Sequence, residues 1–131
     1  MATTFKDIIA WQKAYDYCLY VYHTSSVFPD FEKFGLRSQF TRAAVSIPAN
    51  IAEGFKKLSK QDKLRFFNIA QGSLEECRCY NILSKDLGYI TDEQFSNLEA
   101  KIEGTSYFLN QYCDGIIKDN ALNATNIVSS L

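Results

Sequence analysis

Apolar residues recur at intervals of three and four through most of the chain, which predicts helices, and no stretch alternates as a strand would. Four helical segments follow from this spacing, over residues 5–28, 34–53, 60–87 and 91–118. Helices of about 20 residues are ~30 Å long, and short links between them favour antiparallel neighbours. The pattern therefore predicts an all-α, antiparallel, up-down-up-down four-helix bundle over residues 1–118. We expect residues 119–131 to form a C-terminal tail that is frayed or docked on a neighbour through Ile127 and Val128.

The same spacing assigns an inner face to three of the helices. The first helix has a heptad seam of Ile8, Trp11, Tyr15, Cys18 and Tyr22. The third helix is expected to turn inward Phe66, Ile69, Ser73, Cys77, Tyr80, Leu83 and Leu87. The fourth helix keeps the rhythm longest, with Phe95, Leu98, Ile102, Thr105, Leu109, Tyr112 and Ile116.

Local signals set the helix boundaries. Gly54 is expected to end the second helix as a left-handed cap, and Gly88 to end the third. Thr91 and Gln94 have the spacing of a capping box, so the fourth helix begins there. Pro48 lies inside the second helix, where its missing N–H predicts a bend.

The second helix is unusual because residues 39–52 contain one charge, Arg42, and so offer water no charged face. At 100° per residue, one stripe is apolar and consists of Leu36, Phe40, Ala43, Ile47 and Ile51. A polar stripe beside it consists of Gln39, Arg42, Ser46, Asn50 and Glu53. The remaining side is small or apolar and consists of Thr41, Val45, Ala49 and Ala52. We expect the apolar stripe to lie in the core and the small-residue side at a contact between subunits.

The polar stripe is interpreted as a structural network or subunit interface rather than an active site. Arg42 and Glu53 lie about 16 Å apart along one helix, so they cannot pair within it. A buried charge without a partner is costly. The stripe is therefore expected to join Glu75 or Glu76 of the third helix, or a neighbouring subunit.

Composition narrows the class of protein. The chain has 131 residues, enough for one domain with its own core, and is 47% hydrophobic and 15% aromatic. A formal net charge of −1 gives it no bulk attraction for nucleic acid or an anionic membrane, and no apolar run is long enough to span a membrane. More aromatic residues are present than one core needs, which indicates an interface. These are Tyr15, Tyr20, Tyr22, Phe40, Phe67, Tyr107 and Phe108.

Few residues are candidates for catalysis or metal binding. The start of the chain lacks the features of a signal peptide, so we expect a reducing, cytoplasmic setting in which the four cysteines are small buried hydrophobes. Cys77 and Cys79 would point about 200° apart on a helix, which is poor geometry for chelating one ion. The one histidine, His23, is expected at the surface, and the Glu-x-x-His motif of di-iron bundles is absent. No catalytic residue, metal, cofactor or small-molecule substrate is predicted.

Positive charge gathers only around the predicted turn between the second and third helices. The cluster consists of Lys56, Lys57, Lys60, Lys63 and Arg65, with Asp62 as the nearby acid. If several copies present this turn on one face, it could hold RNA phosphates. Phe55 and Phe66 could offer stacking surfaces, although Phe66 fits the core better. The alternative is an ordinary solvated helix start.

One long run of residues resembles a known family. The run Ala44–Gly54 reads AVSIPANIAEG; WQKA at residues 11–14 and GL at 35–36 precede it, and IAQGSLEE at 69–76 follows. These motifs resemble the four-helix-bundle family encoded in 23S rRNA intervening sequences, over about residues 5–117. The resemblance implies an antiparallel bundle that forms a ring-shaped homopentamer. It also links the chain to accessory variability proteins of diversity-generating retroelements, which bind nucleic acid and a reverse transcriptase.

We therefore expect a non-enzymatic homo-oligomer, a pentamer, with a binding or scaffold role and RNA as the candidate partner. The alternative is a nucleic-acid-binding accessory protein to a retroelement reverse transcriptase. An enzyme with a carboxylate-lined site at Glu75 and Glu76 is a third hypothesis, which would require a bound metal or a deep polar pocket.

Overall fold

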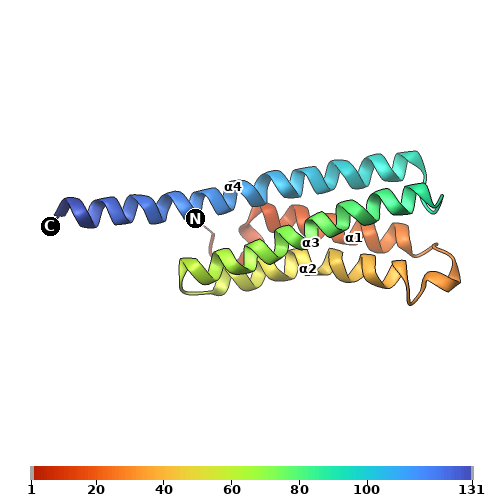
Figure 1. Cartoon of the computed structure of the whole chain (residues 1–131), viewed down its shortest axis with the longest axis horizontal. Coiled ribbons are helices and arrows are strands. Elements are labelled where there is room, and N and C mark those ends of the chain that lie inside the picture. Colours follow the sequence, from red (N-terminus) through yellow and green to blue (C-terminus); the bar gives the residue numbers. More distant parts are fainter. Residues whose placement is uncertain (1, 131) are drawn as a thin grey trace.

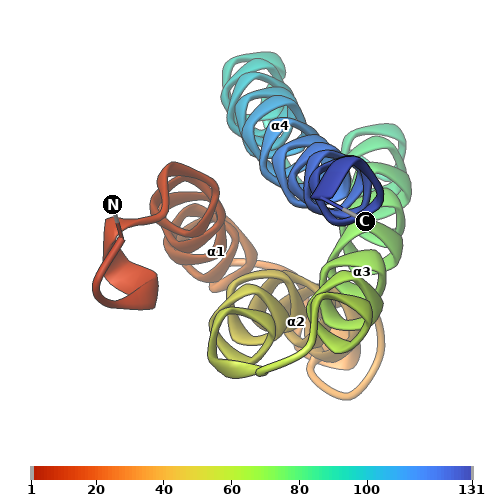
Figure 2. The ribbon, with the colours of Figure 1, turned by 90° about the vertical axis from the view of Figure 1, so that its left-hand side faces the viewer.

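The protein is an all-α, antiparallel four-helix bundle, as the sequence predicts (Figure 1). The computed structural model describes the backbone of residues 2–130 and the side chains of residues 2–119. The helices are α1 (Ile9–Ser25), α2 (Leu36–Lys56), α3 (Lys60–Asp86) and α4 (Asp92–Ser130), with 3-10 turns η1 (Phe5–Asp7) and η2 (Asp30–Glu32). Seen end on, they follow one another around a common core (Figure 2). No strand occurs in the described backbone.

The C-terminal part of α4 runs past the end of the other three helices (Figure 1). The predicted docking of Ile127 and Val128 falls outside the residues whose side chains are described. The boundary at residue 118 therefore stays a prediction.

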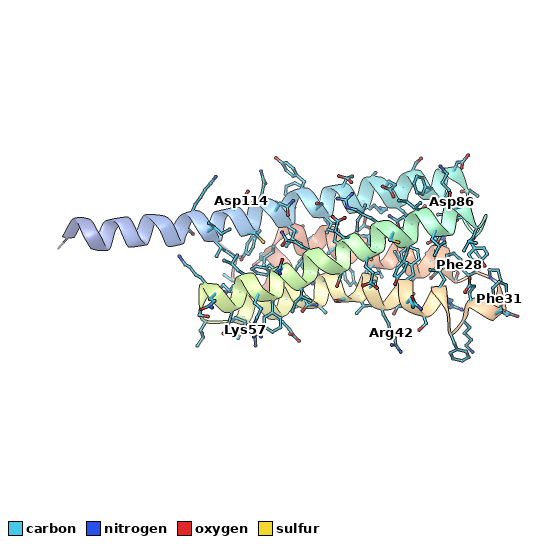
Figure 3. All side chains as sticks on the ribbon, viewed as in Figure 1. Phe28, Phe31, Arg42, Lys57, Asp86 and Asp114 are labelled. Carbon is cyan, nitrogen blue, oxygen red and sulfur yellow. The ribbon has the colours of Figure 1, made fainter. Side chains whose placement is uncertain are left out.

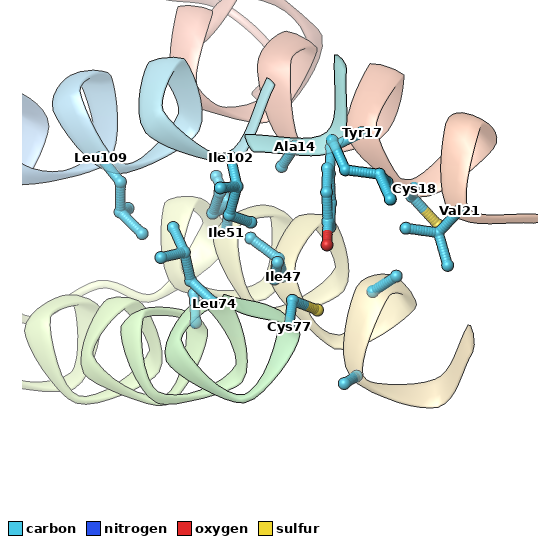
Figure 4. Close-up of a cluster of buried hydrophobic side chains, with 14 of the residues drawn as sticks. Ala14, Tyr17, Cys18, Val21, Ile47, Ile51, Leu74, Cys77, Ile102 and Leu109 are labelled. Carbon is cyan, nitrogen blue, oxygen red and sulfur yellow. The ribbon is translucent and has the colours of Figure 1, made fainter. Parts of the chain in front are cut away.

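The core takes its largest side chains from all four helices (Figure 4). The apolar stripe of α2 is buried throughout, from Leu36 to Ile51, and the sequence prediction for it is confirmed. The prediction for α4 also holds, because Leu98, Ile102 and Leu109 are each 0% exposed.

The inner face predicted for α1 is wrong at two of its positions. Tyr15 is 47% and Tyr22 50% exposed, whereas Tyr17 and Val21 are fully buried. The true inner face also includes Ala10, Ala14 and Thr24. Alanines at this face let α1 approach its neighbours closely, so the larger side chains of the predicted seam lie on its outer flank.

The inner face predicted for α3 is displaced by one position. Phe67, Ala70 and Leu74 face the core, whereas Ile69, Leu83 and Leu87 are exposed. Cys77 is common to the predicted and the observed face. The list of surplus aromatics needs the same correction, because Phe40 and Phe67 are 0% exposed and belong to the core.

Gly54 does not cap α2, which continues to Lys56. Its role is packing: a Cβ at this position would lie 2.6 Å from Phe67 Cε1 and 3.1 Å from Phe66 Cβ. The glycine thus lets α3 approach α2 closely. The predictions for α3 and α4 are confirmed, since Gly88 has a φ of 76° after α3 and Thr91 forms reciprocal bonds with Gln94 before α4. Helix α2 is continuous through Pro48, and the predicted bend there stays a prediction.

Candidate functional site

The outer side of α2 is open to solvent although it carries few charges. Val45 is 41% exposed, Ala49 is exposed, and Thr41 and Ala52 are half-buried. Arg42, from the polar stripe, projects from α2 away from the bundle (Figure 3). Thr41, Val45, Ala49 and Ala52 are the small-residue side that the sequence predicted at a subunit contact.

One part of the polar stripe of α2 connects to α3 through a tyrosine. The Tyr80 hydroxyl donates to Glu76 Oε2 at 2.8 Å and lies 3.2 Å from Gln39 Oε1. Burial, together with the bond to the Glu76 carboxylate, raises the pKa of Tyr80 to about 12. The hydroxyl therefore stays protonated and able to donate at neutral pH.

A second part of the stripe joins α2 to α3 directly. Ser73 Oγ donates to Ser46 Oγ at 2.7 Å, and Asn50 Nδ2 donates to Ser46 Oγ at 3.0 Å and to the Ser46 carbonyl at 2.8 Å. Side chains as short as serine can touch only where the two backbones come close. The bond therefore marks a level at which α2 and α3 are tightly packed.

The two charged members of the stripe are not part of this network. Among the residues with described side chains, none forms a salt bridge with Arg42 or Glu53, and both are exposed. Glu75 instead bonds to Arg78 at 3.1 Å, and Arg78 also bonds to Glu103 of α4. The structure thus brings Gln39 and Glu76 together, while Arg42 and Glu53 remain available to a neighbour.

The basic cluster lies at the end of the bundle where α2 meets α3. Lys63 helps to cap α2, because its ammonium donates to the carbonyls of Gly54 and Phe55 at the C-terminus of that helix. Burial lowers the pKa of Lys63. Lys56 is exposed, and Lys57 and Lys60 are half-buried. Four of the five predicted cations are therefore free of this capping role.

Two of these cations lie over the ring of Phe66, and this side chain is not in the core. Lys57 Nζ is 4.7 Å and the Arg65 guanidinium carbon 5.1 Å from the ring centroid. Arg65 also approaches Asp62 at 3.8 Å, with both side chains more than half exposed. The expectation that Phe66 belongs to the core is wrong, because its neighbour Phe67 takes that place.

The opposite end of the bundle exposes an apolar group that the predicted helix faces do not include. In the link between α1 and α2, Val27 is 74%, Phe31 77% and Phe34 89% exposed. Phe31 lies in the predicted link, and Phe34 begins the predicted second helix outside its apolar stripe. That placement was the sequence signal for exposed aromatic side chains here.

Two further candidates are a metal centre and a site at Glu75 and Glu76. The described residues contain no group of three or more His, Cys, Asp or Glu side chains placed to hold a metal ion. Surface hollows of about 340, 490, 410 and 200 Å³ occur, and neither Glu75 nor Glu76 lines any of them. Cys18, Cys77 and Cys113 are buried as expected, but Cys79 is exposed, and His23 is at the surface as expected.

A search of the described helices finds none that is both long and apolar enough to cross a membrane.

The fold and its surfaces define an antiparallel four-helix bundle with an open face on α2 and a basic end. The model of the 23S rRNA-intervening sequence protein family matches residues 6–111, and the chain belongs to this family. A crystal structure at 1.70 Å of a protein of unknown function from the S23 ribosomal protein family of Bacteroides thetaiotaomicron is similar in fold, with a TM-score of 0.76 and 24% identity. The match covers 83% of this chain and 98% of that one. A comparison with curated proteins gave no match.

Proposed function

We propose that the protein is a non-enzymatic homo-oligomer, a pentamer, that acts in the cytoplasm as an RNA-binding or scaffold protein. The outer side of α2 carries the contact between subunits, and the basic end carries the contact with RNA. The observation that carries this proposal is the exposure of Val45 and Ala49 on α2, between its buried apolar stripe and the exposed charges Arg42 and Glu53. A surface helix ordinarily shows water a charged face.

The charges beside this face support the assembly. Arg42 and Glu53 flank it and have no salt-bridge partner among the described side chains, so they can pair across a subunit boundary. A polar rim around an apolar centre is the usual composition of a protein interface. The number of five subunits rests on the family resemblance.

The basic end supports the RNA contact. Lys57 and Arg65 both lie over the Phe66 ring, and Lys56 and Lys60 flank Lys57 in the chain. The whole chain carries a net charge of −1, so any attraction for phosphate is local. In a ring, each copy adds the same four cations to one face. Phosphate binding of this kind depends steeply on salt concentration.

Substitution of Ala49 by glutamate tests the assembly. Ala49→Glu places a charge at the centre of the contact, so we expect light scattering to give the monomer mass while circular dichroism shows unchanged helix content. Ile82→Glu is the matched control, since Ile82 is 51% exposed on α3, away from this face. An Ala49→Glu protein that kept the wild-type mass would contradict the proposed contact.

Two other hypotheses concern the function of the protein. An accessory role beside a reverse transcriptase stays a prediction, and a retroelement in the genomic neighbourhood would favour it. An enzyme with Glu75 and Glu76 in its site is disfavoured, because Glu75 pairs with Arg78 and Glu76 accepts a bond from Tyr80.

A further inference from the structure

We propose that the end of the bundle opposite the basic cluster is a docking surface for a basic, amphipathic helix of another protein. We call this surface the link surface, because its exposed side chains lie in or beside the α1–α2 and α3–α4 links. Its members are Val27, Asp30, Phe31, Phe34, Asp86 and Leu87. The inference goes beyond the proposed function, because it concerns a different surface and does not require the homo-oligomer.

Two phenylalanines of the link surface project into solvent. Phe31 is 77% and Phe34 89% exposed, and Val27 in the same link is 74% exposed. Phe28, also in this link, is only 5% exposed. The link therefore buries one of its aromatic rings against the bundle and leaves the other two in water. Two such rings present roughly 300 Å² of apolar surface, which is the size of a functional patch on a single protein.

The fold holds these rings outward, because the α1–α2 link is fastened on both sides. Glu32 Oε1 accepts a bond from the Leu36 N–H at 3.1 Å, and Glu32 Oε2 accepts one from the Tyr89 hydroxyl at 2.8 Å. The rings of Phe28 and Tyr89 also pack with centroids 5.1 Å apart, which ties the two links together. The link surface is thus ordered before a partner arrives. Preordered anchors lose less entropy on binding.

The charge at this end of the bundle is negative. Residues 23–37 and 85–93 hold five acids and three cations. Asp30 and Asp86 are exposed, and neither forms a salt bridge among the described side chains. Asp86 and Phe31 lie at the same end of the bundle (Figure 3). The exposed apolar side chains therefore have acids beside them.

Two of the three cations at this end lie over aromatic rings. Lys33 Nζ is 5.6 Å from the centroid of Phe34, and Lys85 Nζ is 4.4 Å from that of Phe95. Among the described side chains, neither lysine forms a salt bridge, nor does Arg37. The acids of the link surface can therefore pair with cations of a partner.

The apolar and the acidic side chains together select the kind of partner. The acids repel RNA and an anionic membrane, and they also repel the same end of a second copy. An amphipathic helix with lysine or arginine beside its apolar side fits both features, since it covers Phe31 and Phe34 and pairs with Asp30 and Asp86. The apolar patch is smaller than the ~800 Å² that each partner buries in a standard interface, so we expect micromolar affinity.

Fluorescence anisotropy with a defined probe tests the link surface. The probe is a fluorescein-labelled amphipathic peptide of leucine and lysine, and its counterpart has glutamate in place of lysine. We expect the wild-type protein to bind the lysine peptide, with an affinity that falls as salt is raised, and not to bind the glutamate peptide. Phe31→Ser/Phe34→Ser should weaken binding at least about tenfold. Asp30→Asn/Asp86→Asn should weaken it about threefold and make the salt dependence shallower.

Leu58→Ser is the matched control, because Leu58 is 100% exposed but lies in the turn between α2 and α3 at the other end. This variant should bind the lysine peptide as the wild type does. All the substituted side chains are exposed, so circular dichroism should show unchanged helix content in every variant.

Several results would overturn the inference. These are a wild-type protein that does not bind the lysine peptide, equal binding of the glutamate peptide, and unchanged affinity in Phe31→Ser/Phe34→Ser. A lower solution mass of this variant would instead assign the surface to a second copy. Loss of wild-type sedimentation with phosphatidylcholine–phosphatidylserine vesicles in this variant would assign it to a membrane. The peptide measurements leave the proposed function untouched, because its residues lie on α2 and at the basic end.

Discussion

Tyr17 of α1 donates a hydrogen bond from its hydroxyl to Asn81 Oδ1 of α3 over 2.7 Å, and both side chains are fully buried. The bond crosses the core between two helices that are not consecutive in the chain. Asn81 Nδ2 also lies 3.4 Å from Glu99 Oε1 of α4. A polar link of this kind fixes the relative height of the helices, because any sliding would leave buried groups without partners.

Removal of the Tyr17 hydroxyl should lower the free energy of unfolding. Tyr17→Phe leaves the buried Asn81 oxygen without its donor, so we expect a loss of about 1–3 kcal/mol in the free energy of unfolding, measured by urea denaturation. Tyr20→Phe is the control, because the Tyr20 hydroxyl accepts a 3.0 Å bond from Asn97 at the surface and should lose less than about 0.5 kcal/mol. Equal effects of the two substitutions would contradict the role assigned to the buried bond.

Cys77 should make the bundle sensitive to alkaline pH. Burial raises the pKa of the Cys77 thiol from 9.0 to about 12, so the unfolded chain releases this proton at lower pH than the folded protein. The stability from Cys77 is therefore complete below pH 9 and is lost as pH rises toward 12. At pH 10.5 the loss is on the order of 2 kcal/mol.

Comparison of Cys77→Ala with Cys79→Ala between pH 8 and 10.5 checks this expectation. Cys77→Ala should be less stable than wild type at pH 8 but should show a flatter decline with pH. Cys79→Ala, which removes the exposed thiol, is the matched control. Parallel declines for wild type and Cys77→Ala would show that the thiol does not titrate as described.

Gly54 should not tolerate a methyl group, although alanine favours a helix. The added Cβ would meet Phe67, which is fully buried and cannot move aside, so we expect Gly54→Ala to destabilise the bundle by about 1–3 kcal/mol. Gly115→Ala in α4 is the matched control, because a Cβ there meets nothing within 4 Å. That substitution should stabilise by roughly 0.5–1 kcal/mol, as in a free helix position. Thermal melts of both variants check this expectation, and a Gly54→Ala protein as stable as Gly115→Ala would contradict the packing role of Gly54.

The sequence predicted the bundle because the inner faces of α2 and α4 and the boundaries at Gly88 and Thr91 leave little ambiguity. In α4, Leu98, Ile102 and Leu109 have no competing apolar seam, and Thr91 and Gln94 define the start. In α1, two apolar seams compete, and periodicity alone cannot say that the one with Ala14, Tyr17 and Val21 faces the core.

The other differences between the predicted and the observed structure also have physical causes. Alanines carry little hydrophobic weight in a pattern, yet Ala10 and Ala14 determine how closely α1 packs. Glycine is the residue type typical of a helix C-cap, and only the position of Phe67 reveals the packing role of Gly54. The Tyr17–Asn81 bond joins residues 64 positions apart, which no local pattern can pair.

RNA binding at the basic end should depend on the free cations. Lys56→Ala/Lys57→Ala/Lys60→Ala should weaken binding of a structured RNA and reduce the slope of log K against log salt by about 2–3, since each lost phosphate contact removes a little less than one. Lys33→Ala/Lys85→Ala removes positive charge outside the basic cluster and is the control. Lys63 is left intact because it caps α2. Filter binding that shows no salt-dependent affinity in the wild-type protein would remove the RNA proposal.

We expect the open side of α2 to be covered by another copy of the chain in solution. The most direct measurement is the solution mass of the wild-type protein by light scattering during size exclusion, recorded with the absorbance of co-purified nucleic acid. We expect a single species of five times the 14.9 kDa chain mass, with nucleic acid that is released at high salt. A clean monomer of 14.9 kDa would contradict it.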